Sequence, residues 1–263
     1  MKTGRVFLFP HVRGNVSENE IKAVEEKLSA FGISHTRDEN GEYDAVIALG
    51  GDGTMLNAAS VAFKRDVPIM SINFGTLGYM SGLENGELDM LEKLKSGFDT
   101  EDRMLIEAEV VRGGNTVAKC TSLNEVVISR STDGDIAHLE LKCDGAKVCD
   151  YRADGIIVAT PTGSSAYNMS AGGPIIDTKL NAMCVCPICP HAMGGKALVF
   201  SPNSSLEIIV YNSDGNDILL CDGRKVSETA HGDVIKIKKS ERTLKLIKLK
   251  KDAFYETLYK KLS

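Results

Sequence analysis

The sequence predicts an α/β amino-terminal domain with a mostly parallel sheet, followed by an all-β domain built as a sandwich. In the first hundred residues, strand-length apolar runs alternate with helical periodicity, which is typical of a parallel sheet covered by helices on both faces. From about Arg103 the pattern changes to short β-like runs separated by turn residues, which is typical of a sandwich. A chain of 263 residues is long enough for two such domains.

The elements of the first domain each have a recognisable signal. Ser17 and Glu20 have the spacing of a capping box, which predicts a helix start. The expected strands are Val6–Phe9, Asp44–Leu49 and Val67–Ile72, and the expected helices cover 17–31, 55–63 and about 88–94. Because ligands bind beyond the carboxyl ends of strands in such Rossmann-like sheets, the turns after the second and third strands, 50–54 and 73–78, are candidate binding sites.

The second domain is predicted from its turns and its short apolar runs. Turn signals occur at 113–115, 133–135 and 213–216, and a helix is expected at 164–169. In Lys236–Lys251 the apolar residues largely alternate with lysines, which indicates half-buried strands with a solvated outer face. The expected strands are Leu105–Val111, Asn124–Ser129, His138–Cys143, Gly155–Ala159, Ala197–Phe200, Leu206–Tyr211 and Ile218–Cys221.

Composition excludes several classes of function. The formal net charge of −5 gives no basic footprint for nucleic acid or for an acidic membrane surface. No apolar stretch approaches the ~20 residues of a membrane span, and the first residues lack a signal-peptide pattern. Seven cysteines are an odd number, so we expect thiols rather than a disulfide framework. The expected location is the cytoplasm.

A glycine turn carrying one carboxylate follows the second expected strand. Gly50-Gly51-Asp52-Gly53-Thr54 has neither P-loop nor GxGxxG spacing. Its glycines let backbone N–H groups approach an anion, and the helix start that follows favours phosphate. An acid in a phosphate cradle is unfavourable unless it binds a metal or accepts a proton, which indicates phosphoryl transfer. An equally weighted interpretation is a structural turn in which Asp52 caps the helix.

A hydroxyl-rich turn and an Asn-Glu pair are further candidates. Asp154–Tyr167 passes from a strand through Thr-Pro-Thr-Gly into a helix start. Its hydroxyl and N–H groups suit a phosphate or a ribose, and Tyr167 offers a ring for base stacking. Asn124-Glu125 opens another strand. Taken singly, each also fits an ordinary turn, and Asp222-Gly223 is common hairpin chemistry.

The segment Cys184–His191 holds three thiols and one imidazole, which suggests zinc. Its cysteines lack the paired knuckle spacing of structural zinc sites, and cysteine also serves as a small buried hydrophobe, so the second interpretation is favoured. A serine hydrolase is excluded by pattern, because Ser164 and Ser165 lack a G-x-S-x-G elbow.

Together these motifs resemble the NAD kinase family. They are Gly50–Thr54, Asn73–Gly78, Asn124-Glu125, Asp154–Tyr167, Ser170–Pro174 and Pro187–His191, in the family's order. The resemblance implies an α/β domain over 1–100, a β-sandwich NAD-binding domain over 101–239, an active site between them, and a tail, 240–263, that returns to the first domain. It implies transfer of the γ-phosphoryl group of ATP or polyphosphate to the 2′-hydroxyl of the adenosine ribose of NAD, giving NADP.

The resemblance also implies residue roles. Asp52 accepts the proton of that hydroxyl, and Asn124 and Glu125 contact the ribose and phosphate region of NAD. Arg152 and Asp154 lie near the nicotinamide half. The phosphate-binding turn consists of Gly50, Gly51, Gly53 and Thr54, with Gly53 against the substrate. The adenosine pocket is lined by Thr162, Ser165, Ala166, Tyr167, Asn168, Met169 and Ser170. Cys186 and the Asp222-Gly223 region lie where the family makes further contacts.

The resemblance implies a divalent metal, Mg²⁺, bound with the phosphoryl donor, without metal ligands from the protein or a prosthetic group, and a homodimer or homotetramer. Tyr79 replaces a common Phe, and Gly195-Lys196-Ala197 stands where the family often has Arg-Pro, which leaves the loop after His191 open. Two alternatives also stay open: a lipid kinase that shares GGDGT, and a non-catalytic NAD(P)-binding sensor. The sequence does not distinguish ATP from polyphosphate, or NAD from NADH.

Overall fold

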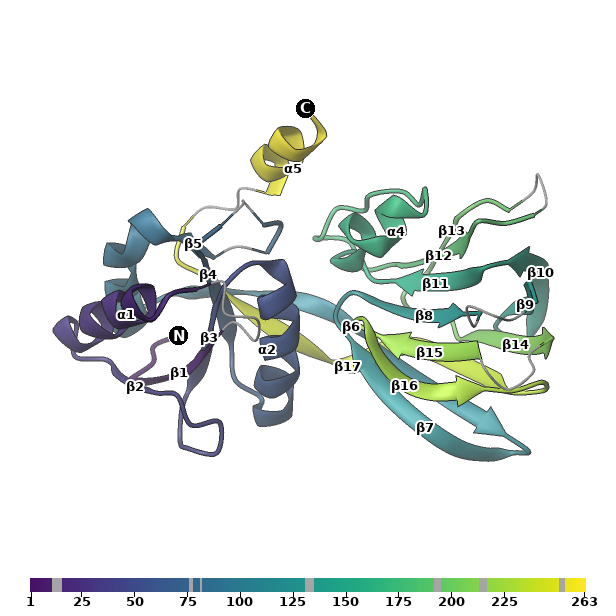
Figure 1. Cartoon of the computed structure of the whole chain (residues 1–263), viewed down its shortest axis with the longest axis horizontal. Helices are drawn as coiled ribbons and strands as arrows, with labels where there is room; N and C mark the ends of the chain where they lie inside the picture. The colour runs from purple at the N-terminus through teal and green to yellow at the C-terminus, as the bar shows by residue number, and fades with distance from the viewer. Residues whose placement is uncertain are drawn as a thin grey trace. The chain divides into compact units, whose positions relative to one another are not determined.

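The computed structural model describes residues 1–10, 16–75, 78–80, 82–130, 135–191, 195–212, 217–250 and 254–263. They form two compact units (Figure 1): unit 1 comprises Met1–Arg103 and Leu244–Ser263, and unit 2 comprises Met104–Thr243. No helix in these ranges is long and apolar enough to cross a membrane. The expected turn at 213–216, and residues 76–77 and 133–134 of two other expected turns, lie outside the described residues.

A parallel sheet forms the centre of unit 1. Its strands are β1 (Arg5–Phe9), β2 (Ser34–Thr36), β3 (Ala45–Leu49), β4 (Ile69–Asn73), β5 (Leu83–Glu84) and the last residues of β17 (Val234–Lys248). Their order is β17-β4-β3-β1-β2, with β5 beside β4, and they pair in parallel. Every residue of β3 and β4 is buried, which explains why both were recognisable as largely apolar runs.

Helices cover the two faces of this sheet. In α1 (Glu18–Ala30) the capping box is present, with the Ser17 hydroxyl accepting the Glu20 N–H and the Glu20 carboxylate accepting the Ser17 N–H. The buried side of α1 packs in one cluster with Leu8 and Ile47. Because successive strand residues point to opposite faces, the other face is left for α2 (Asp52–Arg65), which contacts β3 and β4.

The helix expected at 88–94 is wrong in type. The chain forms a 3₁₀ helix, η1 (Asn85–Glu92), followed by one turn of α-helix, α3 (Lys93–Ser96). Leu88, Leu91 and Leu94 are buried as their spacing indicated. Three-residue spacing fits a 3₁₀ helix, in which residues i and i+3 eclipse, as well as it fits an α-helix. The sequence also did not reveal β2, β5 or the terminal helix α5 (Phe254–Leu262).

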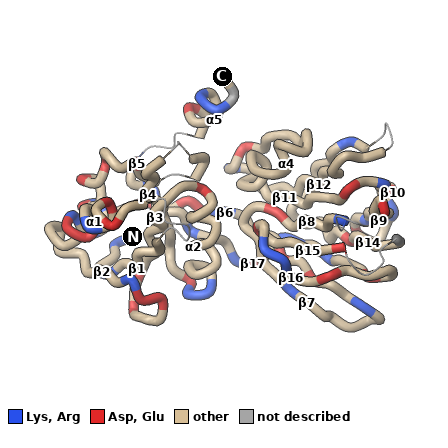
Figure 2. Tube along the Cα trace, in the orientation of Figure 1, with Lys and Arg blue, Asp and Glu red and all other residues tan. Residues whose placement is uncertain are grey.

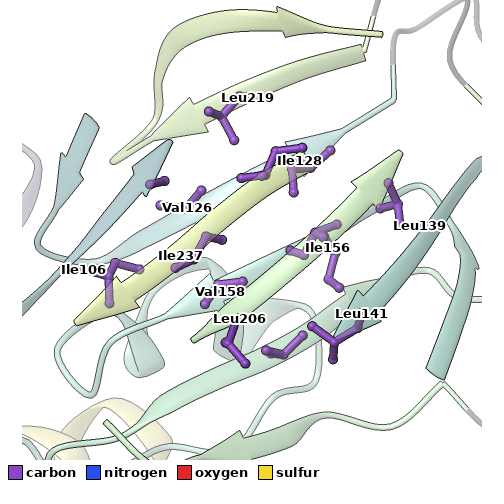
Figure 3. Close-up of a cluster of buried hydrophobic side chains, with 14 of the residues drawn as sticks. Ile106, Val126, Ile128, Leu139, Leu141, Ile156, Val158, Leu206, Leu219 and Ile237 are labelled. Carbon is purple, nitrogen blue, oxygen red and sulfur yellow. The ribbon is translucent and has the colours of Figure 1, made fainter. Parts of the chain in front are cut away.

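Unit 2 is a sandwich of two sheets, which confirms the predicted fold class. One sheet has the order β13-β12-β11-β8-β15-β16, and the other β10-β9-β14-β17 continued by β6 and β7. Their inner faces share one apolar cluster that includes Ile106, Val126, Leu139 and Ile156 (Figure 3). The strands are β6 (Asp99–Arg112), β7 (Asn115–Ser122), β8 (Glu125–Ser129), β9 (Ala137–Cys143), β10 (Ala146–Ala153), β11 (Gly155–Ala159), β12 (Met183–Ile188), β13 (Leu198–Phe200), β14 (Leu206–Asn212), β15 (Asp217–Cys221) and β16 (Arg224–Thr229).

The lysine-rich stretch forms β17, with Ile235 and Ile237 buried and Lys236 and Lys238 exposed. This confirms the prediction of a half-buried strand. Its lysines face acidic residues, with Nζ–O distances of 3.8 Å for Lys236–Glu207, 3.9 Å for Lys238–Glu107 and 3.0 Å for Lys248–Glu101. Acidic and basic residues are interspersed along the trace of both units (Figure 2).

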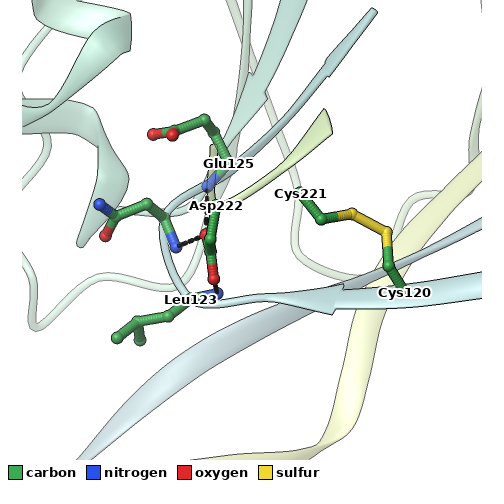
Figure 4. The surroundings of a disulfide bond; sticks show 6 residues. Cys120, Leu123, Glu125, Cys221 and Asp222 are labelled. Atoms are coloured by element: carbon green, nitrogen blue, oxygen red, sulfur yellow. Dashed lines mark hydrogen bonds between the residues drawn. A yellow bond between two sulfur atoms is a disulfide. The ribbon is translucent and has the colours of Figure 1, made fainter. Parts of the chain in front are cut away.

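The expectation of free thiols is wrong for one pair of cysteines. Cys120 of β7 and Cys221 at the end of β15 form a disulfide (Figure 4), with their Cα atoms 6.6 Å apart. A separation of 101 residues hides this proximity from the sequence. The other five cysteines are free, and Cys184 and Cys186 are buried in β12, as expected for small hydrophobes.

Candidate functional site

In unit 1 the glycine turn connects β3 to α2. Gly50 has φ of 146°, in the region that favours glycine, and its N–H donates to the Ile72 carbonyl of β4 over 2.8 Å. Gly51 is the N-cap of α2, and its carbonyl accepts the N–H groups of Thr54 and Met55. The first N–H groups of a helix have no acceptor within the helix and point outward from its end. The turn therefore presents N–H donors and the positive end of the helix dipole.

Asp52 is the first residue of α2, so the interpretation of Asp52 as its N-cap is wrong. Its carboxylate instead accepts two backbone N–H groups of the loop after β4, from Tyr79 at 2.9 Å and Met80 at 3.0 Å. The loop is thus held beside the glycine turn by a charged acceptor. Burial and the Asp52 charge raise the pKa of Tyr79, whose ring lies 4.4 Å from the Lys261 Nζ of α5.

The turn after β4 lies beside the glycine turn, because β3 and β4 are parallel neighbours whose carboxyl ends share one edge. The Asn73 amide oxygen accepts the Gly75 N–H over 3.2 Å, and its nitrogen donates to Glu84 over 3.0 Å. A Cβ built on Gly51 would lie 3.7 Å from that Asn73 oxygen. A Cβ on Gly53 would meet no atom of the described residues within 4 Å, the backbone of its own helix apart. The described residues thus leave the space in front of Gly53 open.

A small cavity of about 60 Å³ lies behind this loop, within unit 1. Tyr79, Met80 and Glu84 line it, together with residues of β17 and α5. Nucleotide-sized ligands need several hundred Å³, so this cavity is too small to hold one. The glycine turn therefore stays the candidate binding site of unit 1.

In unit 2, Asn124 and Glu125 stand at the start of β8 and are held from two sides. The Asp222 carboxylate accepts the N–H groups of Leu123 (2.9 Å), Asn124 (2.8 Å) and Glu125 (3.2 Å). Figure 4 shows Asp222 beside Leu123 and Glu125 with these bonds dashed. On the other side, the Thr160 hydroxyl donates to the Leu123 carbonyl over 2.5 Å, and the Thr160 N–H donates to the Asn124 carbonyl over 2.8 Å. The main chain of this segment is therefore tightly fixed.

The side chains of this fixed segment are buried but incompletely bonded. Asn124 is 7% and Glu125 6% exposed, yet Asn124 Oδ1 and Glu125 Oε2 have no partner in the described structure. Buried polar atoms almost always have partners, so these two oxygens on adjacent residues are candidates to bond a ligand. Burial and, secondarily, the negative charge of Asp222 raise the pKa of Glu125 to about 7.

The Thr-Pro-Thr-Gly turn packs directly on this segment. A Cβ on Gly163 would lie 2.1 Å from the Asn124 carbonyl oxygen, so only glycine permits the approach. The turn continues into η2 (Gly163–Ser165) and α4 (Tyr167–Ser170), which replace the single helix expected at 164–169 because the backbone of Ala166 is not helical. Thr162 and Ser165 are buried, while Tyr167 is 44% exposed and can offer its ring to a ligand.

Asn168 fixes the second half of this turn. It is fully buried, and its amide nitrogen donates to the carbonyls of Ser164 (3.1 Å) and Pro174 (3.0 Å). Gly173 packs so closely that a Cβ there would lie 2.2 Å from Asn168 Oδ1. The geometry gives Asn168 a scaffold position. Ala166, Met169 and Ser170 are at least partly exposed around it.

Three other predicted site residues, Asp154, Arg152 and Cys186, make their contacts with other parts of unit 2. Asp154 forms an ion pair with Arg130, with 2.6 Å between Arg130 Nε and Asp154 Oδ1. No sequence motif had indicated Arg130. Arg152 is exposed on β10, and its carbonyl accepts the His191 N–H over 2.8 Å. Cys186 is 2% exposed in an apolar cluster with Val127, and burial raises the pKa of its thiol.

Two family models match this chain over most of its length. Residues 12–94 match the ATP-NAD kinase N-terminal domain, and residues 123–249 match the ATP-NAD kinase C-terminal domain. The chain belongs to the NAD kinase family. The amino-terminal match contains the glycine turn of unit 1, and the carboxy-terminal match begins at Leu123, where the segment held by Asp222 starts.

Curated relatives and solved structures agree with this NAD kinase assignment. The chain is 41% identical to the NAD kinase of Syntrophotalea carbinolica, covering 84% of this chain and 79% of the relative, and 40% identical to that of Symbiobacterium thermophilum, covering 85% and 80%. An NAD kinase from Archaeoglobus fulgidus in complex with ATP has a TM-score of 0.81 at 27% identity, covering 98% of both chains. Yeast NADH kinase complexed with NADH shares the fold, with a TM-score of 0.90 at 20% identity over 100% of this chain and 88% of the yeast chain.

As in many kinases, the phosphoryl donor would bring a metal ion to this NAD kinase family member. Within the described ranges no three His, Cys, Asp or Glu side chains are grouped to hold a metal. Mg²⁺ usually keeps several waters and binds through substrate phosphates and one or two carboxylates, so it does not require such a group.

Proposed function

We propose that this chain phosphorylates the 2′-hydroxyl of the adenosine ribose of NAD, with ATP as donor, to form NADP. One observation carries the proposal: this chain of the NAD kinase family has both a candidate base and a candidate dinucleotide site. The base is Asp52 at the N-terminus of α2, and the site is formed by the unpaired buried oxygens of Asn124 and Glu125. The first supplies a base beside a phosphate-binding turn, and the second supplies a polar site for the dinucleotide.

Asp52 is proposed as the proton acceptor. A ribose hydroxyl is a weak nucleophile at neutral pH, and a positioned carboxylate removes its proton as the new P–O bond forms. The N–H groups of Tyr79 and Met80 hold this carboxylate in one orientation. Gly50, Gly51, Gly53 and Thr54 offer the turn that receives the phosphates, and the helix dipole stabilises their charge. Mg²⁺ bound to ATP would neutralise phosphate charge during transfer.

Unit 2 is proposed to bind NAD. Asn124 and Glu125 hydrogen-bond the ribose and phosphate region, and Arg152 and Asp154 lie near the nicotinamide half. Tyr167 stacks on the adenine ring, a contact that suits its exposed position. The other residues proposed to line the adenosine pocket are Thr162, Ser165, Ala166, Asn168, Met169 and Ser170, with a further contact from Cys186. The proposed setting is the cytoplasm, and the proposed assembly is a homodimer or homotetramer.

NADP formation tests this function directly. Purified protein is incubated with NAD and Mg²⁺, with ATP in one series and polyphosphate in another, and NADP is measured by a dehydrogenase specific for it. We expect NADP with ATP. Phosphorylation of a diacylglycerol or sphingosine instead would identify a lipid kinase. Tight NADP binding without turnover on either donor would identify a sensor, and both results would overturn the proposal.

The variant Gly53→Ala tests whether the glycine turn binds phosphate or has only a structural role. A Cβ at this position meets no protein atom within 4 Å, so thermal stability should stay within about 1 °C of wild type or rise slightly. The methyl group would occupy space proposed for the donor phosphates, and we expect the KM for ATP to rise about tenfold. Gly86→Ala, which also meets no protein atom, is the matched control with unchanged kinetics. An unchanged KM for ATP in Gly53→Ala would remove this turn from phosphate binding.

A further inference from the structure

Asp222 lies in the hairpin turn between β15 and β16. Its Asp-Gly pattern is that of an ordinary hairpin turn, and the family resemblance places further contacts in this region without a role for the Asp222 side chain. It has φ of 49° and Gly223 follows with φ of 73°, as an Asp-Gly turn requires. Turn geometry alone does not use the side chain. Here the carboxylate reaches back to a segment 97 to 99 residues earlier and accepts three consecutive N–H groups, from Leu123, Asn124 and Glu125.

The contact between Asp222 and this segment is reciprocal. The Asp222 N–H donates to the Glu125 carbonyl over 3.0 Å, so main chain and side chain both hold the same segment. The N–H groups of Leu123 and Asn124 precede β8, whose pairing begins at Glu125, and the Asp222 carboxylate supplies their acceptor. The side chains carried by this segment, Asn124 and Glu125, bear the unpaired buried oxygens.

We propose that Asp222 is a positioning residue for the dinucleotide: its carboxylate fixes the Leu123–Glu125 segment so that the side chains of Asn124 and Glu125 are aimed at the ligand. This inference rests on the proposed function, and it adds a residue that acts through the main chain of two others. Asp222 does not itself touch the substrate.

The charge of Asp222 has a second consequence at Glu125. Burial raises the pKa of both carboxyl groups, and the three N–H donors oppose that shift at Asp222. Burial and the charge of Asp222 raise the pKa of Glu125 to about 7. Among the neighbouring groups, the positive charge of Arg224 lowers the pKa of Asp222. Ala159 of β11, which pairs with Glu125, and residues 160–165 carry no charge. Below pH 7 the Glu125 carboxyl is protonated and donates a hydrogen bond to the dinucleotide; above pH 7 it becomes a second anion.

Asp222→Asn tests the proposal because asparagine tolerates the same left-handed backbone. Its amide oxygen can still accept the N–H groups of Asn124 and Glu125. Its NH₂ group would face the Leu123 N–H, and because both are donors that hydrogen bond is lost. We expect the KM for NAD to rise about tenfold and kcat at saturating NAD to change less than about threefold. The KM of wild type is expected to rise as pH increases through 7, and in the variant this rise is expected at lower pH, since the charge that raised the Glu125 pKa is gone.

The chain offers a matched control in a second Asp-Gly turn of the same unit. Asp144 has φ of 52°, Gly145 follows it, and its carboxylate accepts the Ser205 N–H over 2.8 Å. Asp144→Asn should leave the KM for NAD and its pH dependence unchanged. If both variants behave alike, or if Asp222→Asn has wild-type kinetics, Asp222 is a turn residue only and the proposal is overturned.

Two further variants keep the test decisive. Glu125→Gln cannot titrate, and we expect its KM for NAD to be flat between pH 6 and 8; a persisting rise would show that another group titrates. Cys120→Ala with Cys221→Ala removes the disulfide next to Asp222, and an unchanged KM for NAD is expected. A tenfold rise there would assign the positioning to the covalent bond and overturn the role of Asp222.

Calorimetry of NAD binding separates this inference from the proposed function. Each variant is first melted, and a Tm within a few degrees of wild type shows that it is folded. If wild type binds NAD but forms no NADP, the proposed reaction fails while the Kd comparison still tests Asp222. If wild type forms NADP and Asp222→Asn binds NAD with wild-type Kd, only the inference fails.

Discussion

Asp52→Asn is expected to lower kcat for NADP formation by about 10²–10⁴-fold, the usual contribution of general-base catalysis. The amide is nearly the same size as the carboxylate but cannot accept the proton of the ribose hydroxyl. The KM for NAD should change little, because the proposed dinucleotide contacts are made by residues of unit 2. Initial rates at saturating ATP and NAD measure the effect.

The structure gives Asp52 a second role that this experiment must separate from the first. Its carboxylate holds the N–H groups of Tyr79 and Met80, and asparagine retains an acceptor for only one of them. We therefore expect a loss of stability of about 1–3 kcal/mol in addition to the loss of turnover. Asp89→Asn, which changes an exposed acid of the same unit, is the matched control with wild-type turnover and stability.

A particular pair of results would contradict the base role. If Asp52→Asn melts at lower temperature but turns over normally when folded, Asp52 is a loop anchor and not the proton acceptor. The variant should still bind NAD in calorimetry. Loss of NAD binding together with turnover would point to a collapsed loop rather than to missing base catalysis.

Gly163→Ala is expected to give the largest loss of stability among single methyl additions at the candidate site. The new Cβ would lie 2.1 Å from the carbonyl oxygen, 2.4 Å from the carbonyl carbon and 2.7 Å from the Cα of Asn124. These are backbone atoms fixed by Asp222 and Thr160, so no side-chain rotation relieves the overlap. We expect unfolding to be about 3 kcal/mol easier, which lowers the Tm by roughly 6–12 °C.

The same substitution should also weaken NAD binding, because relief of the overlap requires the Asn124 segment to move. Thermal melts followed by fluorescence and by circular dichroism give the stability, and the KM for NAD below the melting range gives the functional effect. Gly86→Ala, whose Cβ meets no protein atom within 4 Å, controls for the general cost of replacing glycine. A Gly163→Ala protein with the Tm of wild type would show that this turn packs less closely on Asn124 than the structure indicates.

The fold was largely predictable because its main elements carry local signals. β3 and β4 are buried along their whole length, so apolar runs were sufficient to identify them. The capping box of α1 involves only residues three apart. Among the missed strands, β7, β10 and β16 have mostly exposed or half-buried residues, so no apolar run indicates them. β12 is buried along its whole length, but its two cysteines and proline directed the interpretation to zinc or to a buried segment rather than to a strand. The domain bounds from sequence and the residue roles taken from the family resemblance remain predictions.

The sequence by itself determined the class of fold and the glycine-rich segments, because turn chemistry and apolar periodicity are properties of neighbouring residues. Only the tertiary structure decided what individual carboxylates do. By local pattern Asp52 fitted a helix cap as well as a base, and its carboxylate accepts an N–H group of a loop 27 residues later. By local pattern Asp222 fitted a hairpin turn, and its carboxylate holds the segment before β8. Cys120 and Cys221 meet for the same reason. A side chain's long-range partner depends on how strands distant in sequence are brought side by side, and local pattern contains no record of that pairing.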